Sequence, residues 1–372
     1  SAAGLSLPAQ GIMKILLLSA YDTDSHRSWC QGLMAHLPNI QWHYLSLPGR
    51  FFSWRIRGNP LSWALGKDKQ VLQQNFDLIL ATSMVDLATL RGLAPTLAQI
   101  PAIMYFHENQ FAYPKSDQQH TSIEPQMVNL YSALSAQRVL FNSQYNRDSF
   151  LLGADKLLKR LPDEVPPGII QSIEEKSRVL PVPIAEHVAS SKDSSHHETL
   201  TVIWNHRWEY DKGPELLKAV VDLVESQELA IEFIIAGLSF RNIPPSLQQL
   251  QEKHPRCIAH IGTYAQKSDY LSALDNSQVV LSTAHHEFQG LAMLEAAARG
   301  CIPLAPDRLA YPEWVPKACL YKNGSLDKQA ANIVAKLKHW QQHGLPKPVP
   351  VASYFWPSLI GQYLKEFNDL LD

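Results

Sequence analysis

The sequence predicts an α/β protein built from two doubly wound parallel sheets. Short apolar runs alternate with amphipathic segments along nearly the whole chain, and one linker-like stretch interrupts this alternation. At 372 residues the chain is long enough for two domains, each with its own core. We therefore expect domains at residues 12–185 and 198–350, followed by a C-terminal segment at residues 351–372.

The first domain is expected to contain five strands, because five short apolar runs follow one another at the spacing of βαβ units. These strands are Lys14–Ser19, Gln41–Ser46, Phe76–Ala81, Ala102–Phe106 and Arg138–Asn142. Helices are expected at Trp29–Leu37 and from Gln144 onward. Lys156–Lys176 is polar and charged, and Val182–Ser195 combines two prolines with a Ser/Lys/Asp/His run that is typical of a linker.

The second domain repeats the pattern. Its expected strands are Leu200–Trp204, Ala230–Ala236, Ile258–Ile261, Val279–Ser282 and Ile302–Ala305. Prolines at 346–350 break the chain before an amphipathic helix at Trp356–Leu371, for which a return to the first domain is one option. Two domains of this kind place a ligand cleft between the carboxyl ends of their strands.

The composition is that of an ordinary globular protein. The net charge of −2 gives no global support for nucleic-acid binding, so any basic surface must be local. The four cysteines form no C-x-x-C pair, which favours buried free thiols in a reducing compartment. No apolar stretch reaches the roughly 18 to 20 residues that span a bilayer. Because Ser1–Gly11 also lacks the features of a signal peptide, we expect a cytoplasmic location.

The segment Glu287–Glu295, Glu-Phe-Gln-Gly-Leu-Ala-Met-Leu-Glu, carries the strongest functional signal. It follows a predicted strand and enters a predicted helix, Leu291–Arg299, that Gly300 ends. A helix N-terminus after a short loop binds anions through free N–H groups and the helix dipole. Carboxylates on both sides of such a site suit a ligand with hydroxyls at either end of a diphosphate, as in a nucleotide sugar.

Two cations follow the first strand of the second domain. Arg207 and Lys212 flank a short loop and are expected to stabilise a leaving diphosphate. Taken alone they are better explained as a solvated pair, and only the neighbouring Glu287–Glu295 segment reverses that balance. A glycosidase pair formed by the two glutamates would leave both cations unused.

The first domain has polar residues at the ends of its predicted strands. His107 ends one strand and is either a ligand-binding residue or a structural cap, with equal weight. Ser25, His26 and Asn142 follow two other strands at the same edge. Asp22-Thr23-Asp24 matches the Asp-x-Asp metal pattern, but so short a match is better explained as loop polarity.

A basic, aromatic-rich stretch at Pro48–Gly58 is expected to be a loop. Arginines interleaved with aromatic residues suit phosphates and stacked bases, although a partly buried loop is the weightier explanation of this stretch alone. Lys156, Lys159 and Arg160 add positive charge further along the chain. These two patches are the expected docking places for a nucleic acid. Several motifs are missing: Gly-x-Gly-x-x-Gly after the first strand, a P-loop, and Gly-x-Ser-x-Gly.

Several of these segments resemble a known family. Asn205–Gly213 and the E-x₇-E segment are similar to the retaining GT-B glycosyltransferases of family 4, which have two Rossmann-like domains facing across a cleft. The closer resemblance, from about Lys14 to Glu313, is to the tRNA-queuosine α-mannosyltransferases. It is carried by Ala20-Tyr21, Ser25-His26, Leu47–Arg57, Phe106–Gln110, Phe141–Ser143 and Asn205–Trp208.

The resemblance implies transfer of mannose from GDP-mannose to a cyclopentenediol hydroxyl of queuosine in tRNA, with retention and without a required metal. It places Arg207 and Lys212 on the diphosphate, Glu287 on the sugar hydroxyls, Glu295 on the ribose, and His107 beside the reacting centre. The phosphate would be bound by the backbone amides of Phe288, Gln289, Gly290 and Leu291. The expected acceptor-binding residues are Ser25, His26, Arg50, Trp54, Arg55, Arg57, His107, Asn109 and Asn142.

One departure from the family pattern concerns Asp22 and Asp24, which stand where the family has a glycine-rich turn before Ser25-His26. Three alternatives remain open on the sequence alone. One is a family-4 transferase with a lipid, glycan or small-metabolite acceptor. Another is a nucleotide- or RNA-binding module without catalysis, and the third is a sugar-nucleotide epimerase or phosphorylase. The expected catalytic residues are His107, Arg207, Lys212 and Glu287, with no enzyme nucleophile among them.

Overall fold

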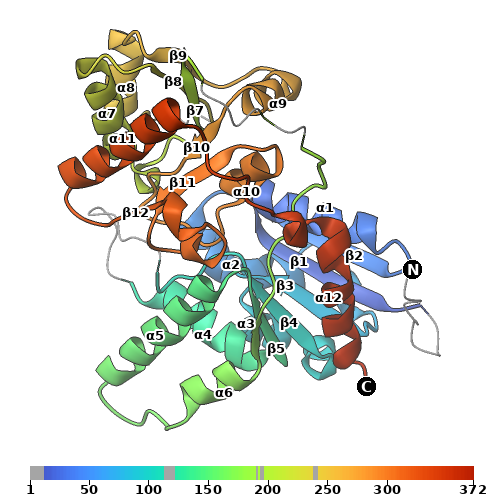
Figure 1. Ribbon diagram of the computed structural model, residues 1–372. Coiled ribbons are helices and arrows are strands. Elements are labelled where there is room, and N and C mark those ends of the chain that lie inside the picture. Colours follow the sequence, from blue (N-terminus) through green and yellow to red (C-terminus); the bar gives the residue numbers. More distant parts are fainter. Residues whose placement is uncertain (1–11, 113–121, 190–191, 193–196, 238–241) are drawn as a thin grey trace. The chain divides into compact units, whose positions relative to one another are not determined.

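The computed structural model describes residues 12–112, 122–189, 192, 197–237 and 242–372 (Figure 1). The expectations for Ser1–Gly11 and for part of Val182–Ser195 lie outside the described residues. The chain forms two compact units. Unit 1 comprises the chain up to Pro183 together with Trp356–Asp372, and unit 2 is Ile184–Phe355.

Unit 1 is built on a six-stranded parallel sheet with strand order β2-β1-β3-β4-β5-β6. Its strands are β1 (Lys14–Asp22), β2 (Gln41–Pro48), β3 (Leu78–Thr82), β4 (Ala102–Phe106), β5 (Arg138–Phe141) and β6 (Ser177–Val179). Every residue of β3 and β4 is buried, as expected for strands covered on both faces. Because all six strands are parallel, their carboxyl ends meet at one edge of the sheet.

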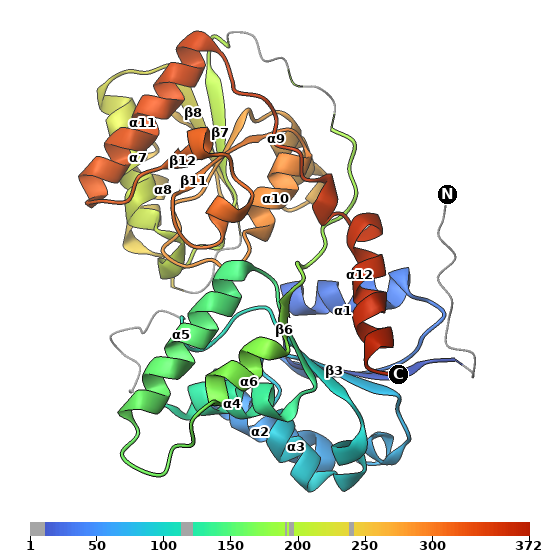
Figure 2. The same ribbon diagram turned by 60° about the horizontal axis from the view of Figure 1, so that its bottom comes forward.

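Helices cover both faces of this sheet. They are α1 (Asp24–His36), α2 (Phe52–Ala64), α3 (Leu87–Leu93), α4 (Glu124–Ser135), α5 (Gln144–Arg160), α6 (Ile169–Glu175) and α12 (Trp356–Asp369). Figure 2 shows α1 and α12 on one face and α2, α3 and α4 on the other. The arrangement is the doubly wound architecture that the alternation of apolar and amphipathic segments predicts.

Helix α12 belongs to unit 1 although it follows unit 2 in the chain. Trp29 donates a hydrogen bond from Nε1 to the Tyr363 hydroxyl at 3.0 Å, and Tyr363 donates to the Pro181 carbonyl at 2.8 Å. The ring of Trp356 lies directly on Gly32 of α1, where a Cβ atom would overlap it. The helix therefore completes the core of unit 1 on the α1 face.

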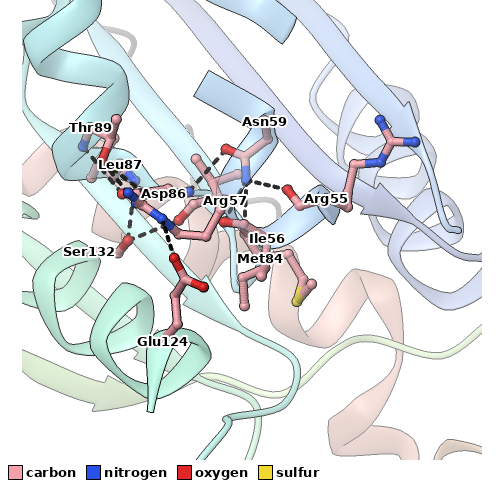
Figure 3. A network of polar contacts seen from close by, with 11 residues as sticks. Arg55, Ile56, Arg57, Asn59, Met84, Asp86, Leu87, Thr89, Glu124 and Ser132 are labelled. Atoms are coloured by element: carbon pink, nitrogen blue, oxygen red, sulfur yellow. Dashed lines mark hydrogen bonds and ion pairs between the residues drawn. The ribbon is translucent and has the colours of Figure 1, made fainter. Parts of the chain in front are cut away.

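The expectation of a loop at Pro48–Gly58 is wrong from Phe52 onward, because α2 begins there and continues through Pro60. A proline inside a helix removes one N–H group and leaves the carbonyl four residues earlier without its donor. Here the Asn59 side chain replaces it: Nδ2 donates to the carbonyls of Ile56 at 3.2 Å and Arg55 at 2.8 Å (Figure 3). The local sequence contains two helix breakers, and a side-chain amide compensates for one of them.

Unit 2 contains a second six-stranded parallel sheet, with strand order β12-β11-β10-β7-β8-β9. Its strands are β7 (Leu200–Trp204), β8 (Ile231–Ile235), β9 (Ile258–Ile261), β10 (Val279–Leu281), β11 (Ile302–Pro306) and β12 (Leu320–Tyr321). Its helices are α7 (Pro214–Ser226), α8 (Pro245–Lys253), α9 (Lys267–Asp275), α10 (Leu291–Ala298) and α11 (Leu326–His343). The predicted fold class, two doubly wound parallel sheets, is confirmed.

The described residues also bear on the predictions about the cysteines and about membrane-spanning helices. All four cysteines are buried and free. Among the described helices, none combines the length and the apolar character that crossing a membrane requires.

Candidate active site

Two loops of unit 2 meet at the carboxyl ends of the neighbouring strands β7 and β10. Gly213, at φ +68°, ends the loop after β7, and a Cβ atom there would overlap the Thr283 carbonyl. The Thr283 hydroxyl donates to the Lys212 carbonyl at 2.7 Å and accepts from Trp204 Nε1 at 3.0 Å. This close packing requires glycine at position 213 and brings Lys212 next to the loop that precedes α10.

Lys212 and Glu287 form an ion pair at the beginning of α10. Lys212 Nζ lies 2.8 Å from Glu287 Oε2 and also donates to the His286 carbonyl at 3.2 Å. Glu287 Oε1 accepts from the Gly290 amide at 3.1 Å. Both side chains are largely buried. The ammonium group is therefore held in a defined position at the helix N-terminus.

The pKa of Glu287 is lowered from its ordinary value. Burial acts to raise this pKa, but attraction and hydrogen bonding from Lys212 outweigh that effect, and the Gly290 amide adds to the lowering. The carboxyl group is consequently ionised at neutral pH. An ionised carboxylate beside an anion-binding position suits the hydroxyl groups of a sugar, because it accepts hydrogen bonds and donates none.

The N-terminus of α10 is shaped for an anion. Gly290 precedes the helix at φ +84°, and a Cβ atom there would lie 2.9 Å from Cε1 of Tyr311. The first amides of a helix lack partners within the helix, and Gly290 has no side chain with which to cap them. Tyr311 is fixed by a 2.7 Å hydrogen bond to Ser282. In proteins, backbone amides at a helix N-terminus are able to bind phosphate groups.

The other two charged residues expected at the donor site are more exposed. Arg207 follows β7, has a side chain that is 41% exposed, and contacts Glu209 only at 3.9 Å. Glu295 lies in α10, beyond Glu287 in sequence, and is exposed. The structure thus brings Lys212, Glu287 and the amides of Phe288, Gln289, Gly290 and Leu291 together, and leaves Arg207 and Glu295 accessible to solvent.

Two further residues of this loop were not predicted as site residues. The Asn205 amide donates to the Tyr270 hydroxyl at 3.0 Å and to the Ala292 carbonyl at 3.1 Å. His206 bonds through Nε2 to the Leu281 carbonyl at 3.0 Å, and burial lowers its pKa to about 4. Both side chains join the end of β7 to the segments around α10. Their place directly before Arg207 was the available sequence signal.

In unit 1, His107 directly follows β4 and is buried. Its ring stacks on His26, with centroids 4.2 Å apart, and lies perpendicular to the Trp29 ring at a centroid distance of 4.9 Å. Within the described residues, neither ring nitrogen has a hydrogen-bond partner. Burial, reinforced by repulsion from His26, holds the pKa of His107 well below its ordinary value. The imidazole is therefore neutral.

A polar chain that the sequence did not reveal fixes His26. Its Nε2 lies 3.0 Å from Glu108 Oε2, while Glu108 Oε1 accepts from the Ser83 hydroxyl at 3.1 Å. His26 comes from the first turn of α1, Ser83 follows β3, and Glu108 follows β4. Ser25 is half-buried and lies 3.4 Å from the Thr23 hydroxyl. The predicted rim residues Ser25, His26 and His107 thus lie at the carboxyl edge of one sheet.

Asn109 and Asn142 hold the turn after β4 in place. Asn109 is fully buried, and its amide donates to Asn146 Oδ1 at 2.8 Å. Asn142 donates to the His107 carbonyl at 2.9 Å and accepts from the Asn146 amide at 2.9 Å. These contacts position the backbone of His107.

The Asp22-Thr23-Asp24 segment spans the end of β1 and the beginning of α1. Asp22 is buried and accepts hydrogen bonds from Ser19, Tyr44 and Arg27. Asp24 is exposed and lies 3.5 Å from Arg27. In the described part of the chain, no group of three or more His, Cys, Asp or Glu side chains is arranged to hold a metal ion.

The expected acceptor residues around α2 differ in their exposure and in their partners. Arg57 is bound to Asp86, and its Nε donates to Glu124 at 3.0 Å (Figure 3). Arg50 and Trp54 are exposed, and Arg50 lies 5.8 Å from the ring centroid of Phe51. Arg55 is buried.

Two doubly wound parallel sheets in one chain are the architecture of the GT-B fold. Solved structures of low sequence identity share this fold. Anabaena HepE in complex with UDP is 15% identical in sequence and has a TM-score of 0.65. The match covers 96% of this chain and 100% of the HepE chain. The lipopolysaccharide outer core galactosyltransferase WaaB is 11% identical, with a TM-score of 0.62. The match covers 96% of this chain and 99% of the WaaB chain. Sucrose-phosphate synthase from Thermosynechococcus elongatus is 14% identical, also with a TM-score of 0.62. The match covers 96% of this chain and 94% of the synthase chain.

Sequence comparison identifies the family within this class. The family model described as tRNA-queuosine alpha-mannosyltransferase N-terminal matches residues 14–184. The Drosophila melanogaster tRNA-queuosine alpha-mannosyltransferase is 35% identical over 331 residues, which cover 86% of each chain. This chain therefore belongs to the tRNA-queuosine alpha-mannosyltransferase family, and it is a glycosyltransferase. The resemblance predicted from the motifs is confirmed.

Proposed function

We propose that this glycosyltransferase transfers mannose from GDP-mannose to queuosine in tRNA, with retention of configuration at the sugar and in the cytoplasm. The name of the Drosophila relative supports the sugar and the acceptor. The observation that carries the proposal is the Lys212–Glu287 pair at the N-terminus of α10. It places a fixed cation and an ionised carboxylate beside the backbone amides at the beginning of α10, as a nucleotide sugar requires.

On unit 2, each charged group has a distinct role in this proposal. Lys212 and Arg207 stabilise the diphosphate as its negative charge develops in the transition state. The amides from Phe288 to Leu291 bind the phosphate nearer the sugar. Glu287 accepts hydrogen bonds from the mannose hydroxyls, and the exposed carboxylate of Glu295 accepts them from the ribose.

On unit 1, the neutral imidazole of His107 is assigned to the reacting centre. A neutral ring both donates and accepts a hydrogen bond, and the described residues satisfy neither nitrogen. The proposal gives no residue the role of nucleophile: the acceptor hydroxyl attacks on the face from which the diphosphate leaves. The diphosphate oxygen then takes the hydroxyl proton, so no metal and no enzyme base is assigned.

The donor is tested by thermal shift with GDP-, UDP- and ADP-sugars, because a ligand that binds the native fold raises its melting temperature. We expect GDP-mannose to give the largest shift. Mass spectrometry of nucleosides from queuosine-containing tRNA, incubated with the enzyme and GDP-mannose, should then show a hexose added to queuosine. Transcript tRNA lacking queuosine is the matched control. Stabilisation by UDP-sugars alone, or an unmodified queuosine, would contradict the proposal.

A further inference from the structure

Arg55 is a largely buried arginine whose side chain has no hydrogen-bond or ion-pair partner among the described residues. The residue is 8% exposed, Nε is buried without a hydrogen-bond acceptor, and no ion pair is formed. In Figure 3 its guanidinium points away from the Asp86 cluster, and only its backbone carbonyl takes part in a contact. A buried charge without a partner is costly, so proteins keep one where a ligand supplies the missing charge. The guanidinium geometry suits a phosphate.

Arg57, two residues further along α2, is by contrast an arginine with acidic partners. It is bound to the buried carboxylate of Asp86, while Glu124 and Thr89 provide further acceptors. The same helix therefore carries one arginine with acidic partners and one without. The difference points to an anionic ligand for Arg55.

Two exposed aromatic residues, Trp54 and Phe51, here called the platform, lie close to this arginine in the sequence. Trp54 is 52% exposed, and its ring rests on Gly58, where a Cβ atom would lie 2.5 Å from Cε2. Phe51 is 71% exposed and has a left-handed backbone at φ 57°, which is unfavourable for a residue with a side chain. Strain of this kind indicates a functional constraint when it presents an aromatic ring to solvent.

The platform and His107 share one edge of the sheet in unit 1. Phe51 and Trp54 follow the carboxyl end of β2, His107 follows that of β4, and all strands of this sheet run parallel. Arg50, exposed beside Phe51, adds a second cation at this edge. An unpaired nucleotide offers a phosphate, which an arginine binds, and a flat base, which stacks on an aromatic ring.

We propose that Arg55, Trp54 and Phe51 bind one unpaired nucleotide of the acceptor RNA. The Arg55 guanidinium binds a backbone phosphodiester, and the base stacks on the Trp54 ring that Gly58 holds in place. The proposal rests on the proposed function for the choice of RNA as the partner. It goes beyond that function by assigning the contact to single-stranded RNA, so that base-paired RNA is excluded from the platform.

The test is fluorescence anisotropy with a labelled RNA hairpin that has an anticodon-type loop, and with a blunt RNA duplex of equal length. Arg55→Ala should weaken hairpin binding about ten- to a hundredfold, because it removes charge-assisted hydrogen bonds. Its salt dependence should fall by about one phosphate contact. Trp54→Ala should cost about tenfold, whereas Trp54→Phe retains most of the affinity.

Two variants separate the platform from charge and from folding. Lys67→Gln removes an exposed cation beyond the end of α2 and should leave hairpin binding unchanged. Gly58→Ala keeps Trp54 but displaces its ring, and should weaken binding as Trp54→Ala does. The melting temperature of Arg55→Ala should not fall, because no partner loses a contact. Equal binding of hairpin and duplex by the wild type would contradict the proposal.

The remaining outcomes are also decisive. If Arg55→Ala bound the hairpin like the wild type, the proposal would be overturned. It would equally be overturned if this variant lost its thermal stabilisation by GDP-mannose and kept its RNA affinity, since the arginine would then serve the donor. RNA binding that depends on Arg55 and Trp54, in an enzyme that transfers no sugar to queuosine, would refute the proposed function and leave the platform standing.

Discussion

At the scale of single residues, charge on unit 2 is divided between a buried pair and an exposed arginine. Lys212 and Glu287 neutralise each other at 2.8 Å, so part of the positive charge near α10 is already compensated. Arg207 is half-exposed, and its contact with Glu209 is long. Arg207 is therefore the cation best placed to respond to new negative charge on a leaving diphosphate.

Replacing Arg207 by alanine should lower kcat about 10²- to 10³-fold, the usual cost of losing one transition-state charge contact. Its half-exposed side chain has no close acidic partner to leave buried, so the melting temperature should stay unchanged. Steady-state kinetics with GDP-mannose measures the effect. Arg256→Ala is the matched control, because this arginine is exposed and pairs with Glu225. Equal kcat for both variants would remove Arg207 from the donor site.

Acid should destabilise the enzyme through His206. Its pKa falls from 6.5 to about 4 on folding because of burial, so between these values the unfolded state binds one more proton. The contribution of His206 to the free energy of unfolding is fully present above pH 6.5. It is lost as the pH falls toward 4, and the total loss is about 3 kcal/mol. The lowered pKa of His107 acts in the same direction.

Chemical denaturation of the wild type and His206→Gln, measured from about pH 7.5 to about pH 4.5, checks this expectation. Glutamine keeps a donor for the Leu281 carbonyl but does not titrate. The wild type should lose more stability than the variant as the pH falls. Parallel pH profiles would show that His206 does not carry the acid sensitivity.

Sequence patterns revealed the residues whose neighbours are close in the chain. Glu287, Gly290 and Leu291 lie at a strand–loop–helix junction that is recognisable locally, and Lys212 follows another strand end. Glu108 and Ser83 escaped notice as site residues because their role depends on contacts 82 and 25 residues away in sequence. The unpaired state of Arg55 was likewise invisible, since burial and missing partners are properties of the fold.

At the scale of elements, the glycine before α10 meets two requirements: a left-handed backbone conformation and close packing against a neighbouring side chain. Gly290 has φ +84° and lies against Tyr311. Gly168 precedes α6 at the same φ, but a Cβ atom added there would have none of the described heavy atoms within 4 Å beyond its chain neighbours. The two glycines thus share a backbone conformation and differ in their surroundings.

Gly168→Ala should therefore report the backbone cost alone, about 1 kcal/mol in the free energy of unfolding. Gly290→Ala should cost more and should also weaken stabilisation by GDP-mannose, because displacing Tyr311 or the helix start disturbs the phosphate-binding amides. Denaturant unfolding and thermal shift with the donor measure both quantities. A normal donor shift in Gly290→Ala would argue against binding at these amides.

Strands were predicted closely because they are short apolar runs, and most of them, such as β3 and β4, are buried on both faces. The structure extends β1 to Asp22 and β2 to Pro48, and it adds β6 and β12, which have only three and two residues. Helix α2 was misjudged for a physical reason. Its continuity depends on Asn59, which also donates to the Met84 carbonyl and accepts from the Asp86 amide, so distant residues stabilise it.

At the scale of the whole molecule, unit 1 is discontinuous in sequence. Tyr363 of α12 is fully buried and contacts Trp29, Tyr105 and Pro181 through its hydroxyl. Unit 2 comes between these two parts in the sequence and has its own sheet and core. The stability of unit 1 therefore depends on residues that come after unit 2.

Tyr363→Ala should destabilise unit 1 by about 3–5 kcal/mol, the cost of removing a large buried aromatic ring. Hydrogen exchange measured by mass spectrometry should show faster exchange in the strands of unit 1, with β7 to β12 unaffected. Tyr131→Ala, which alters an exposed tyrosine of α4, is the control. Uniform acceleration in both units would show that they unfold as one.

The return of α12 also orders events during synthesis on the ribosome. When Phe355 has emerged from the exit tunnel, every residue of unit 2 is available, whereas the first unit still lacks the helix that covers Trp29 and Gly32. The nascent unit 1 must wait, with that apolar face uncovered, until the residues of α12 have been translated. Premature termination near residue 355 would therefore release a chain whose second half is sound and whose first half is a substrate for chaperones and proteases.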